Sequence, residues 1–327
     1  MTQLLGTGEQ VERFACFGGR CSVLVSGDDG LRSAAEAVRA ARSSLEDWHA
    51  RFSRFIPDSE LSLLNEDRRA EVPASELLVR LAAAVRAAGE LSGGLVDATL
   101  AEEIEIAGYA EDLSKTPLPP ALALALAPPR RPARASGRGR WREVRADLDR
   151  GTVTRPPGLR IDGGGLAKGL FADVLGERLA GHAAYAVDCA GDLALGGGAG
   201  LPRAIGVESP FDGSALHTFA LSAGAVATSG ITKRSWLGGD GRPAHHLLDP
   251  ATGAPAFTGV VQATALAPSA LEAEIRAKAA LLAGPRGAAA HLRHGGAVVC
   301  DDGSCAVFQP ALNFAASSEP PVASPSL

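Results

Sequence analysis

Apolar residues recur every three or four positions in several stretches of the chain, which is the spacing of one face of an α-helix. Residues 22–50 are expected to form a short strand and then a helix, and a second helix is expected at about 75–91. A last helix is expected at 270–284, and another follows a run of glycines and ends near Gly181. The apolar face of the helix after the glycines contains Leu170, Phe171, Val174, Leu175 and Leu179.

Beyond residue 184 the pattern changes to short apolar runs separated by turn residues, which predicts strands. These runs are "YAVD", "LALGG", "AIGVES", "HTFALSAGAVATSG" and "VVQATALA". Residues 143–155 are typical of a hairpin that turns at 149–151, and "AVVC" and "CAVF" predict a terminal hairpin. Because strands outnumber helices and short turns join several neighbours, we predict an α+β fold with mainly antiparallel sheets and packed helices.

The chain has 327 residues, of which 46% are hydrophobic, enough for a sizeable core. We expect a single domain at 1–315, with an exposed loop rich in proline and arginine at about 117–141. The composition of residues 316–327 is typical of a disordered tail.

The net charge and the cysteine pattern restrict the functional classes and the cellular compartment expected for the chain. A net charge of -5 argues against a general nucleic-acid binder, which usually carries a concentrated basic surface. The five cysteines form no CxxC pair, so structural zinc is not expected. The N-terminal residues lack the pattern of a secretory signal, and the apolar run at 121–127 is too short to span a bilayer. A cytoplasmic protein with reduced cysteines is therefore expected.

Residues 161–169, "IDGGGLAKG", place three glycines before the start of a helix. A dinucleotide-binding fingerprint would need glycine where Lys168 stands, and a P-loop would need a hydroxyl residue directly after a Gly-Lys pair. Both motifs therefore fail, but glycines without Cβ let a ligand approach the backbone, and a helix N-terminus favours anions. The segment indicates an anion site with Lys168 as a point charge. The alternative is a simple turn with a solvated lysine.

Polar or small residues gather in four further stretches. The candidates are Ser59, Asn65, Asp97, Thr99, Thr228, Ser229, His246 and Asp249, with Asp58 or Ser59 starting a helix. Each has an ordinary structural explanation, since Asp97 can cap a turn and Asp249 belongs to a common Asp-Pro turn. A lone histidine such as His246 is more often a hydrogen-bonded structural residue than a base.

In chain order, these segments resemble the ApbE family of FAD:protein FMN transferases. The similar segments are "FSRFIPDSELSLLN", "GGLVDATL", "IDGGGLAKG", "CAGDLALGG", "VATSG" and "HHLLDPATG". The resemblance covers about residues 13–310. It implies an ApbE-like fold and an enzyme that cleaves FAD at its pyrophosphate and attaches FMN to a Ser or Thr of a partner protein.

The resemblance also implies roles for individual residues. Lys168 and His246 would be catalytic, with His246 contacting the flavin or transferring a proton. The residues expected to bind FAD are Ser59, Asn65, Asp97, Gly164, Gly165, Lys168, Thr228, Ser229, His246, Asp249 and Lys278. In the family a backbone carbonyl, here that of Ala167, binds Mg²⁺, together with a helical Asp and a Thr four residues later. Glu274 and Lys278 stand at the last two positions.

This departure puts the metal site in doubt. Glutamate still offers oxygen to Mg²⁺, but the ammonium of Lys278 has donors and no acceptor. The two residues can simply form an i,i+4 salt bridge on the helix surface. The alternative hypothesis is that Lys278 takes over part of the ion's neutralisation of the pyrophosphate. Added positive charge from Lys233 agrees with this hypothesis. Ala190 also replaces a glycine of the family pattern.

The leading expectation is FMN transfer from FAD to a Ser or Thr hydroxyl, with release of AMP. The acceptor would carry a Ser/Thr-Gly-Ala-Ser/Thr segment. One alternative is an FAD pyrophosphatase that releases FMN and AMP. The other is a non-catalytic flavin-binding protein that has lost its metal site.

Overall fold

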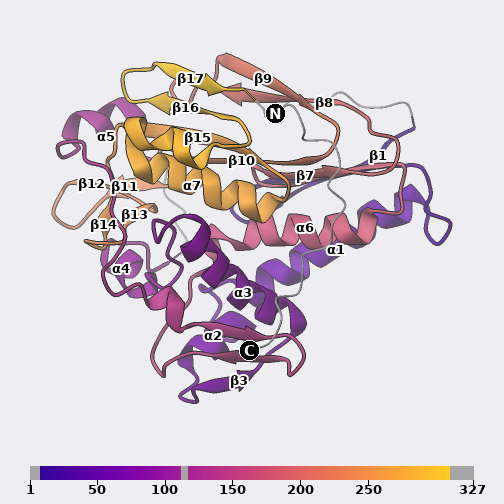
Figure 1. Cartoon of the computed structure of the whole chain (residues 1–327), viewed down its shortest axis with the longest axis horizontal. Coiled ribbons are helices and arrows are strands. Elements are labelled where there is room, and N and C mark those ends of the chain that lie inside the picture. Colours follow the sequence, from indigo (N-terminus) through magenta and orange to yellow (C-terminus); the bar gives the residue numbers. More distant parts are fainter. Residues whose placement is uncertain (1–7, 112–116, 310–327) are drawn as a thin grey trace.

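The computed structural model describes residues 8–111 and 117–309, and its centre is an eight-stranded sheet. All neighbouring strands of this sheet are antiparallel, which confirms the α+β prediction (Figure 1). The order of strands is β1 (Gln10–Cys16), β2 (Gly19–Ser26), β6 (Ala184–Cys189), β7 (Asp192–Gly196), β10 (Gly224–Gly230), β15 (Val260–Ala267), β16 (Gly296–Cys300) and β17 (Cys305–Phe308). The terminal hairpin predicted from "AVVC" and "CAVF" is β16 and β17.

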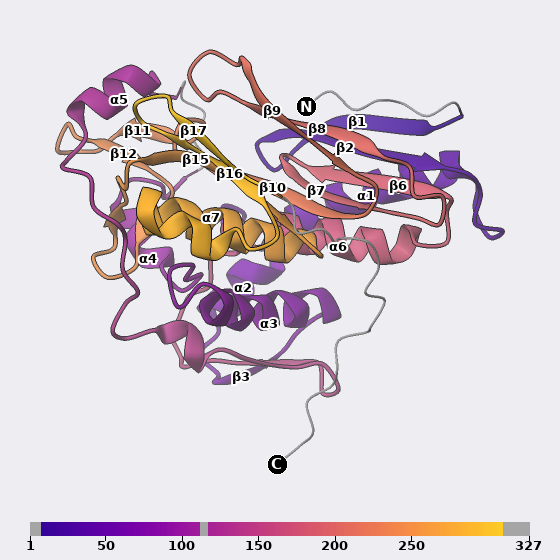
Figure 2. The same ribbon diagram turned by 45° about the horizontal axis from the view of Figure 1, so that its top comes forward.

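Three long helices pack on one face of this sheet, and a separate hairpin covers the other face (Figures 1 and 2). The helices are α1 (Ala34–Phe52), α6 (Ala167–Leu179) and α7 (Ala270–Gly287). The hairpin is formed by β8 (Arg203–Glu208) and β9 (Ala215–Leu221). The core therefore has two layers, a large one under the helices and a small one under β8 and β9.

The ends of these helices follow from local sequence. Ser33 and Glu36 form a reciprocal capping box at the start of α1. Ser269 caps α7 by accepting a hydrogen bond from the backbone of Glu272. The last turn of α7 is kinked at Gly284, which has a φ of 73° and precedes Pro285. Side-chain caps thus fix the starts of α1 and α7, whereas α6 begins without one.

Further elements lie on the side of the helices away from the large sheet (Figure 2). They include α2 (Glu60–Glu66), α3 (Glu76–Leu91) and a small sheet of β3 (Glu71–Pro73), β5 (Thr152–Thr154) and β4 (Arg145–Asp147). The hairpin predicted at 143–155 is β4 and β5. Other short elements are α4 (Ala101–Ile106), β11 (Ser235–Leu237), β12 (Pro243–His245), β13 (Leu248–Asp249) and β14 (Ala254–Pro255).

The expectation of an exposed loop at about 117–141 is wrong in part. The stretch contains a short helix, α5 (Pro120–Leu126), and many of its arginines are exposed. However, Ala133 is buried and its N–H donates to the carbonyl of Leu282. Trp141 is also buried and lies so close to Gly89 of α3 that a Cβ there would be 2.1 Å from its ring. Buried anchors therefore fix a segment whose composition indicates a free loop.

The tail predicted at 316–327 lies outside the described residues. Within 8–111 and 117–309, no helix combines the length and the apolar composition needed to cross a membrane. All five cysteines belong to these ranges and are free thiols.

Candidate active site

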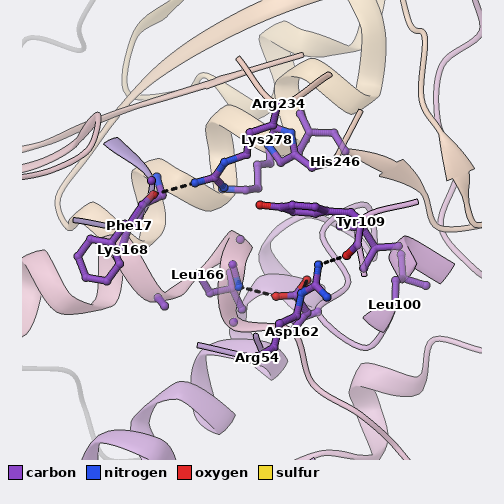
Figure 3. Close-up of a pocket in the computed structure, with 18 of the residues that line it drawn as sticks. Phe17, Arg54, Leu100, Tyr109, Asp162, Leu166, Lys168, Arg234, His246 and Lys278 are labelled. Carbon is purple, nitrogen blue, oxygen red and sulfur yellow. Dashed lines mark hydrogen bonds and ion pairs between the residues drawn. The ribbon is translucent and has the colours of Figure 1, made fainter. Parts of the chain in front are cut away.

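A cavity of about 450 Å³ lies beside the N-terminal end of α6 (Figure 3). Its wall combines the turn between β1 and β2, the C-terminal end of α1, the glycine run, and parts of 95–100 and 233–248. Its aromatic residues are Phe17, Trp48, Phe52, Phe55, Tyr109 and Phe171. Its cationic residues are Arg54, Lys168, Lys233, Arg234 and Lys278. The cavity thus offers aromatic surface and positive charge to one ligand.

The glycine run enters the cavity wall as a single turn of 3₁₀-helix at Gly163–Gly165, and α6 starts at Ala167. The segment before it is held by Asn65, whose side-chain amide exchanges two hydrogen bonds of 2.8 Å with the backbone of Ile161. Asp162 then accepts a hydrogen bond of 2.8 Å from the N–H of Gly164. Asn65 and Asp162 therefore fix the backbone on which Lys168 is mounted.

Two glycines of this segment allow close packing inside the protein. A Cβ on Gly169 would lie 2.6 Å from the carbonyl oxygen of Ala270, so glycine lets α6 approach the start of α7. A Cβ on Gly165 would lie 3.2 Å from the side chain of Lys278. The glycine run therefore brings α7 and its lysine to the cavity, in addition to leaving backbone open to a ligand.

Four charged side chains meet where α6 and α7 come together. Lys168 pairs with Asp192, and its ammonium lies 3.8 Å from Glu274. Glu274 accepts hydrogen bonds of 2.8 Å from Lys278 and 2.9 Å from the N–H of Gly169. Both carboxylates are at most 1% exposed, whereas the lysine side chains are 10–15% exposed and line the cavity. We call Lys168, Asp192, Glu274 and Lys278 the charge cluster.

The neighbours within the charge cluster shift its pKa values. Burial, and then the Glu274 carboxylate, raise the pKa of Asp192 to about 7. Burial also opposes ionisation of Glu274, but Lys278 and then Lys168 outweigh it and hold its pKa at about 2. Burial likewise opposes the charge on Lys168, but Asp192 and Glu274 outweigh it and raise that pKa above its ordinary value. Lys168 and Glu274 are therefore charged at neutral pH.

A second group on the cavity wall was not selected from the sequence as a site. The guanidinium of Arg54 lies 3.3 Å from Asp162, donates to the carbonyl of Tyr109 and packs over the rings of Tyr109 and Phe55 (Figure 3). The signal for Arg54 is its place in "FSRFIPDSELSLLN", one of the segments that resemble the family. Asp192 likewise lies in "CAGDLALGG", another of these segments.

His246 lies on the cavity wall close to Arg234 and Lys278 (Figure 3). Its Nδ1 is buried and has no hydrogen-bond partner among the described residues. Burial, and then the charge of Arg234, lower the pKa of His246 well below its ordinary value. The imidazole is therefore neutral at neutral pH and has an acceptor or donor available for a ligand.

Asp97 also lines the cavity, where it accepts hydrogen bonds from the backbone and hydroxyl of Thr99. Asp97 therefore has both expected features, since the same carboxylate stabilises a turn and lines the cavity. The predicted site residues that line the cavity are Asp97, Gly164, Gly165, Ala167, Lys168, His246 and Lys278.

The other predicted residues do not line the cavity. Ser59 caps α2 by accepting from Ser62, and Asp249 accepts from the backbone of Arg134 and Ala251. Thr228 is exposed on β10 and hydrogen-bonds Thr264 at 2.9 Å. The remaining members of this set are Ser229, Asn65 and Glu274, which are all buried.

Ala190 shows the backbone consequence of one departure from the family pattern. It occupies the turn between β6 and β7 with a φ of 55°, in the left-handed region that glycine adopts more readily. Asp188 accepts a hydrogen bond of 2.8 Å from Gly191 and helps to fix this turn. The turn places Asp192 at the start of β7, next to Lys168.

The residues present do not fit a magnesium ion at Ala167 and Glu274. Magnesium needs oxygen ligands in near-octahedral geometry. Both carboxylate oxygens of Glu274 already accept hydrogen bonds, one from Gly169 and one from Lys278. A dication on either oxygen would also face the positive charge of Lys278. No group of three His, Cys, Asp or Glu side chains within the described ranges is arranged to hold a metal.

Comparisons with known proteins agree on one family. The model of the ApbE family matches residues 17–300, which include α6 and α7. The chain is 28% identical over 274 residues to the FAD:protein FMN transferase of Klebsiella pneumoniae (strain 342), covering 81% of this chain and 76% of that protein. It is 30% identical over 257 residues to the FAD:protein FMN transferase of Treponema pallidum (strain Nichols), covering 72% and 68%.

The fold is shared with a solved structure of similar length. The crystal structure of the ApbE protein from Thermotoga maritima has a TM-score of 0.75 at 25% identity. The superposition covers 92% of this chain and 97% of that protein. It therefore includes both the central sheet and most of the elements around the cavity.

Proposed function

Because the chain belongs to the ApbE family, we propose that it transfers FMN from FAD to a hydroxyl group of a partner protein. The observation that carries this proposal is the cavity beside α6, which combines aromatic side chains with fixed lysines. FAD has a planar ring system and a pyrophosphate, so it needs both kinds of contact. The volume of about 450 Å³ is in the range of small-molecule sites.

We assign the cavity residues to FAD binding. Lys168 and Lys278 face the pyrophosphate, and Gly164 and Gly165 offer backbone at the same end of the cavity. Asp97 and His246 contact other parts of the ligand. The predicted residues outside the cavity act indirectly, as Asn65 does by holding the backbone before the glycine run at Ile161.

In the transfer step, the oxygen of the acceptor hydroxyl forms a bond to the phosphorus of the FMN half. The bond from that phosphorus to the bridging oxygen breaks, and AMP leaves with this oxygen. The acceptor hydroxyl loses its proton in the same step. Lys168 and its neighbours stabilise the negative charge on the phosphoryl oxygens, which is the main electrostatic demand of phosphoryl transfer.

His246 is our candidate for accepting the proton. In the free protein, burial and Arg234 disfavour its protonated form. A bound pyrophosphate would offset the positive charges of Arg234 and Lys278 and raise the pKa of His246 toward neutrality. The residue thus becomes a better base when the substrate is in place, which suits proton transfer near neutral pH.

The test is to mix the protein with FAD and an acceptor protein that carries a Ser/Thr-Gly-Ala-Ser/Thr segment. In-gel fluorescence of the denatured acceptor reports covalent flavin, and chromatography reports AMP. We expect one AMP for each flavin on the acceptor. An acceptor with alanine at both hydroxyl positions is the matched control and should stay unlabelled.

Two outcomes would contradict the proposal, provided the Klebsiella transferase labels the same acceptor. FMN and AMP without a labelled acceptor would identify an FAD pyrophosphatase. Bound FAD that stays intact would identify a flavin-binding protein without transfer. The cytoplasmic location and the sequence of the natural acceptor stay predictions.

A further inference from the structure

We infer that Lys278 is a built-in cation that binds the pyrophosphate of FAD in place of a divalent metal ion. The inference rests on the proposed function, since FAD is the ligand. It concerns the wall of the cavity where α7 meets the glycine run. It predicts that FAD binding and FMN transfer in this protein do not depend on Mg²⁺.

The position of Lys278 is fixed by contacts along its whole length. Its carbon chain passes beside Gly165, where a side chain would lie 3.2 Å from its Cε. Its ammonium donates one hydrogen bond of 2.8 Å to Glu274, and no other acceptor is recorded for it within the described residues. An ammonium has three N–H donors, so donors remain for a ligand in the cavity.

The surroundings of Lys278 exclude a simple surface salt bridge. Glu274 is fully buried, and the side chain of Lys278 is 10% exposed on the cavity wall. Burying a charged pair is costly, and a stability role alone gives weak reason for two such pairs side by side. A fixed positive charge on a cavity wall is what recognition of a polyphosphate needs.

The charge at this end of the cavity also matches the ligand. Lys168, Lys278, Lys233 and Arg234 line it, and the two carboxylates of the charge cluster lie behind the lysines. Four cations against two carboxylates leave at least two positive charges in excess. The pyrophosphate of FAD carries two negative charges, so the site is neutralised without an added dication.

The carboxylate oxygens of Glu274 that would bind a metal ion already accept hydrogen bonds. Glu274, at the position of a family metal ligand, uses one oxygen to hold Lys278 and the other to hold the N–H of Gly169. The carboxylate therefore orients a lysine and the first turn of α6, and the positive charge that faces the ligand is the ammonium.

The first experiment measures the dissociation constant of FAD by fluorescence in Mg²⁺ and in EDTA. For the unchanged protein we expect the two values to agree within about threefold, because the binding energy of the fixed lysines does not require metal. Lys278→Met should raise the dissociation constant in EDTA by roughly 10- to 100-fold, the usual effect of losing a hydrogen bond to a charged group. Lys278→Arg keeps the charge and should retain most of the affinity.

Arg293→Met is the matched control, because it also removes one positive charge but from an exposed pair with Glu272. It should leave FAD binding unchanged. Circular dichroism of each variant establishes that it is folded. Folded Lys278→Met protein that binds FAD as tightly as the unchanged protein would overturn the inference.

A double variant tests whether a metal ion can take the place of Lys278. Glu274→Asp combined with Lys278→Thr restores the two side chains that the family resemblance implies for the metal site. We expect weak FAD binding in EDTA and recovery of at least about tenfold in Mg²⁺. Equal affinity in both conditions would contradict the idea that lysine and metal are alternatives.

The inference and the proposed function fail in different ways. If the unchanged protein binds FAD only in Mg²⁺, the inference is wrong and the proposed function stands. If it binds no FAD in either condition, both are wrong. Binding and acceptor labelling that persist in EDTA support both.

Discussion

Helix α7 carries two acid–base pairs with the same spacing and opposite surroundings. Glu272 and Arg276 form one pair at 2.6 Å, and Glu274 and Lys278 form the other at 2.8 Å. Residues two positions apart on an α-helix point about 200° apart, so the pairs lie on opposite sides of the helix. The first pair reaches Arg293, which is 59% exposed, whereas the second faces the cavity.

The contrast between the two pairs shows that residue spacing alone does not determine the role of an ion pair on a helix. Glu272 is 19% exposed and pairs with the buried guanidinium of Arg276, and it is also reached by Arg293 and His294 from the solvent side. Glu274 is fully buried and shares its lysine with a cavity. The same Glu-to-cation pattern is therefore a structural ion pair that extends to solvent through Arg293 on one side of α7, and part of a binding site on the other.

The largest expected effect is the loss of stability when the glutamate of each pair is replaced by glutamine. Glu274→Gln leaves Lys278 without its buried partner and should lower the free energy of unfolding by about 3–5 kcal/mol. Glu272→Gln should lower it less, by about 1–2 kcal/mol, because glutamine still accepts from Arg276, which also donates to the carbonyl of His291. Urea denaturation of both variants measures the contrast. Equal losses would mean that the two pairs do not differ in the way their burial indicates.

The sequence carried enough information for the fold because the long helices and strands depend on local periodicity. Leu170 and Phe171 mark the buried face of α6, and both are buried in the structure. The short helix α4 has no side-chain N-cap and so no comparable start signal, whereas α5 starts at Pro120 in a stretch whose proline content indicates a loop. Trp141 is fixed by contact with α3, which no local pattern reveals.

The site was predictable only where its chemistry is concentrated in one segment. Lys168 stands three residues after the glycine run, and the structure places it on the cavity. Its partner Asp192 is 24 residues away on β7, and Arg54 and Tyr109 are 55 residues apart. Thr228, by contrast, belongs to a motif-like segment but points to the other face of the sheet. A motif locates a strand, and only the fold decides which of its side chains faces a cavity.

The next largest effect is expected on the rate of FMN transfer when Lys168, the other lysine of the charge cluster, is removed. Lys168→Met should slow FMN transfer by about 100-fold, as expected when a fixed group that stabilises phosphoryl charge is lost. Arg293→Met, which removes an exposed charge from the network on the opposite side of α7, should change the rate by less than about twofold. Initial rates of acceptor labelling at saturating FAD provide the measurement. A Lys168→Met rate near that of the unchanged protein would remove Lys168 from the catalytic step.

The pH dependence of the reaction tests whether the charges around His246 control its pKa. In free protein its pKa lies well below the ordinary value, so the neutral base is present down to acidic pH. kcat/KM, which reports the free protein, should therefore show no loss from His246 between neutral and mildly acidic pH. With FAD bound the pKa of His246 rises, so the acid limb of kcat should lie at a higher pH than that of kcat/KM.

His246→Ala provides the control for this profile. If His246 accepts the proton, the acid limb of kcat should disappear in the variant while the rate falls. A profile that the substitution leaves unchanged would assign the limb to another group. His246 would then be restricted to contact with the flavin.

The smallest effect is expected at Thr228, which tests the contrast between the two faces of the central sheet. Its hydroxyl is paired with the buried Thr264 on the face of the sheet opposite the helices, away from the cavity lysines. Thr228→Val removes that hydrogen bond and should lower the free energy of unfolding by about 1 kcal/mol, with transfer changed less than about twofold. Labelling rates and urea denaturation of the same preparation separate the two effects. A large loss of transfer at full stability would mean that FAD or the acceptor reaches this face, and the site would then extend across β10.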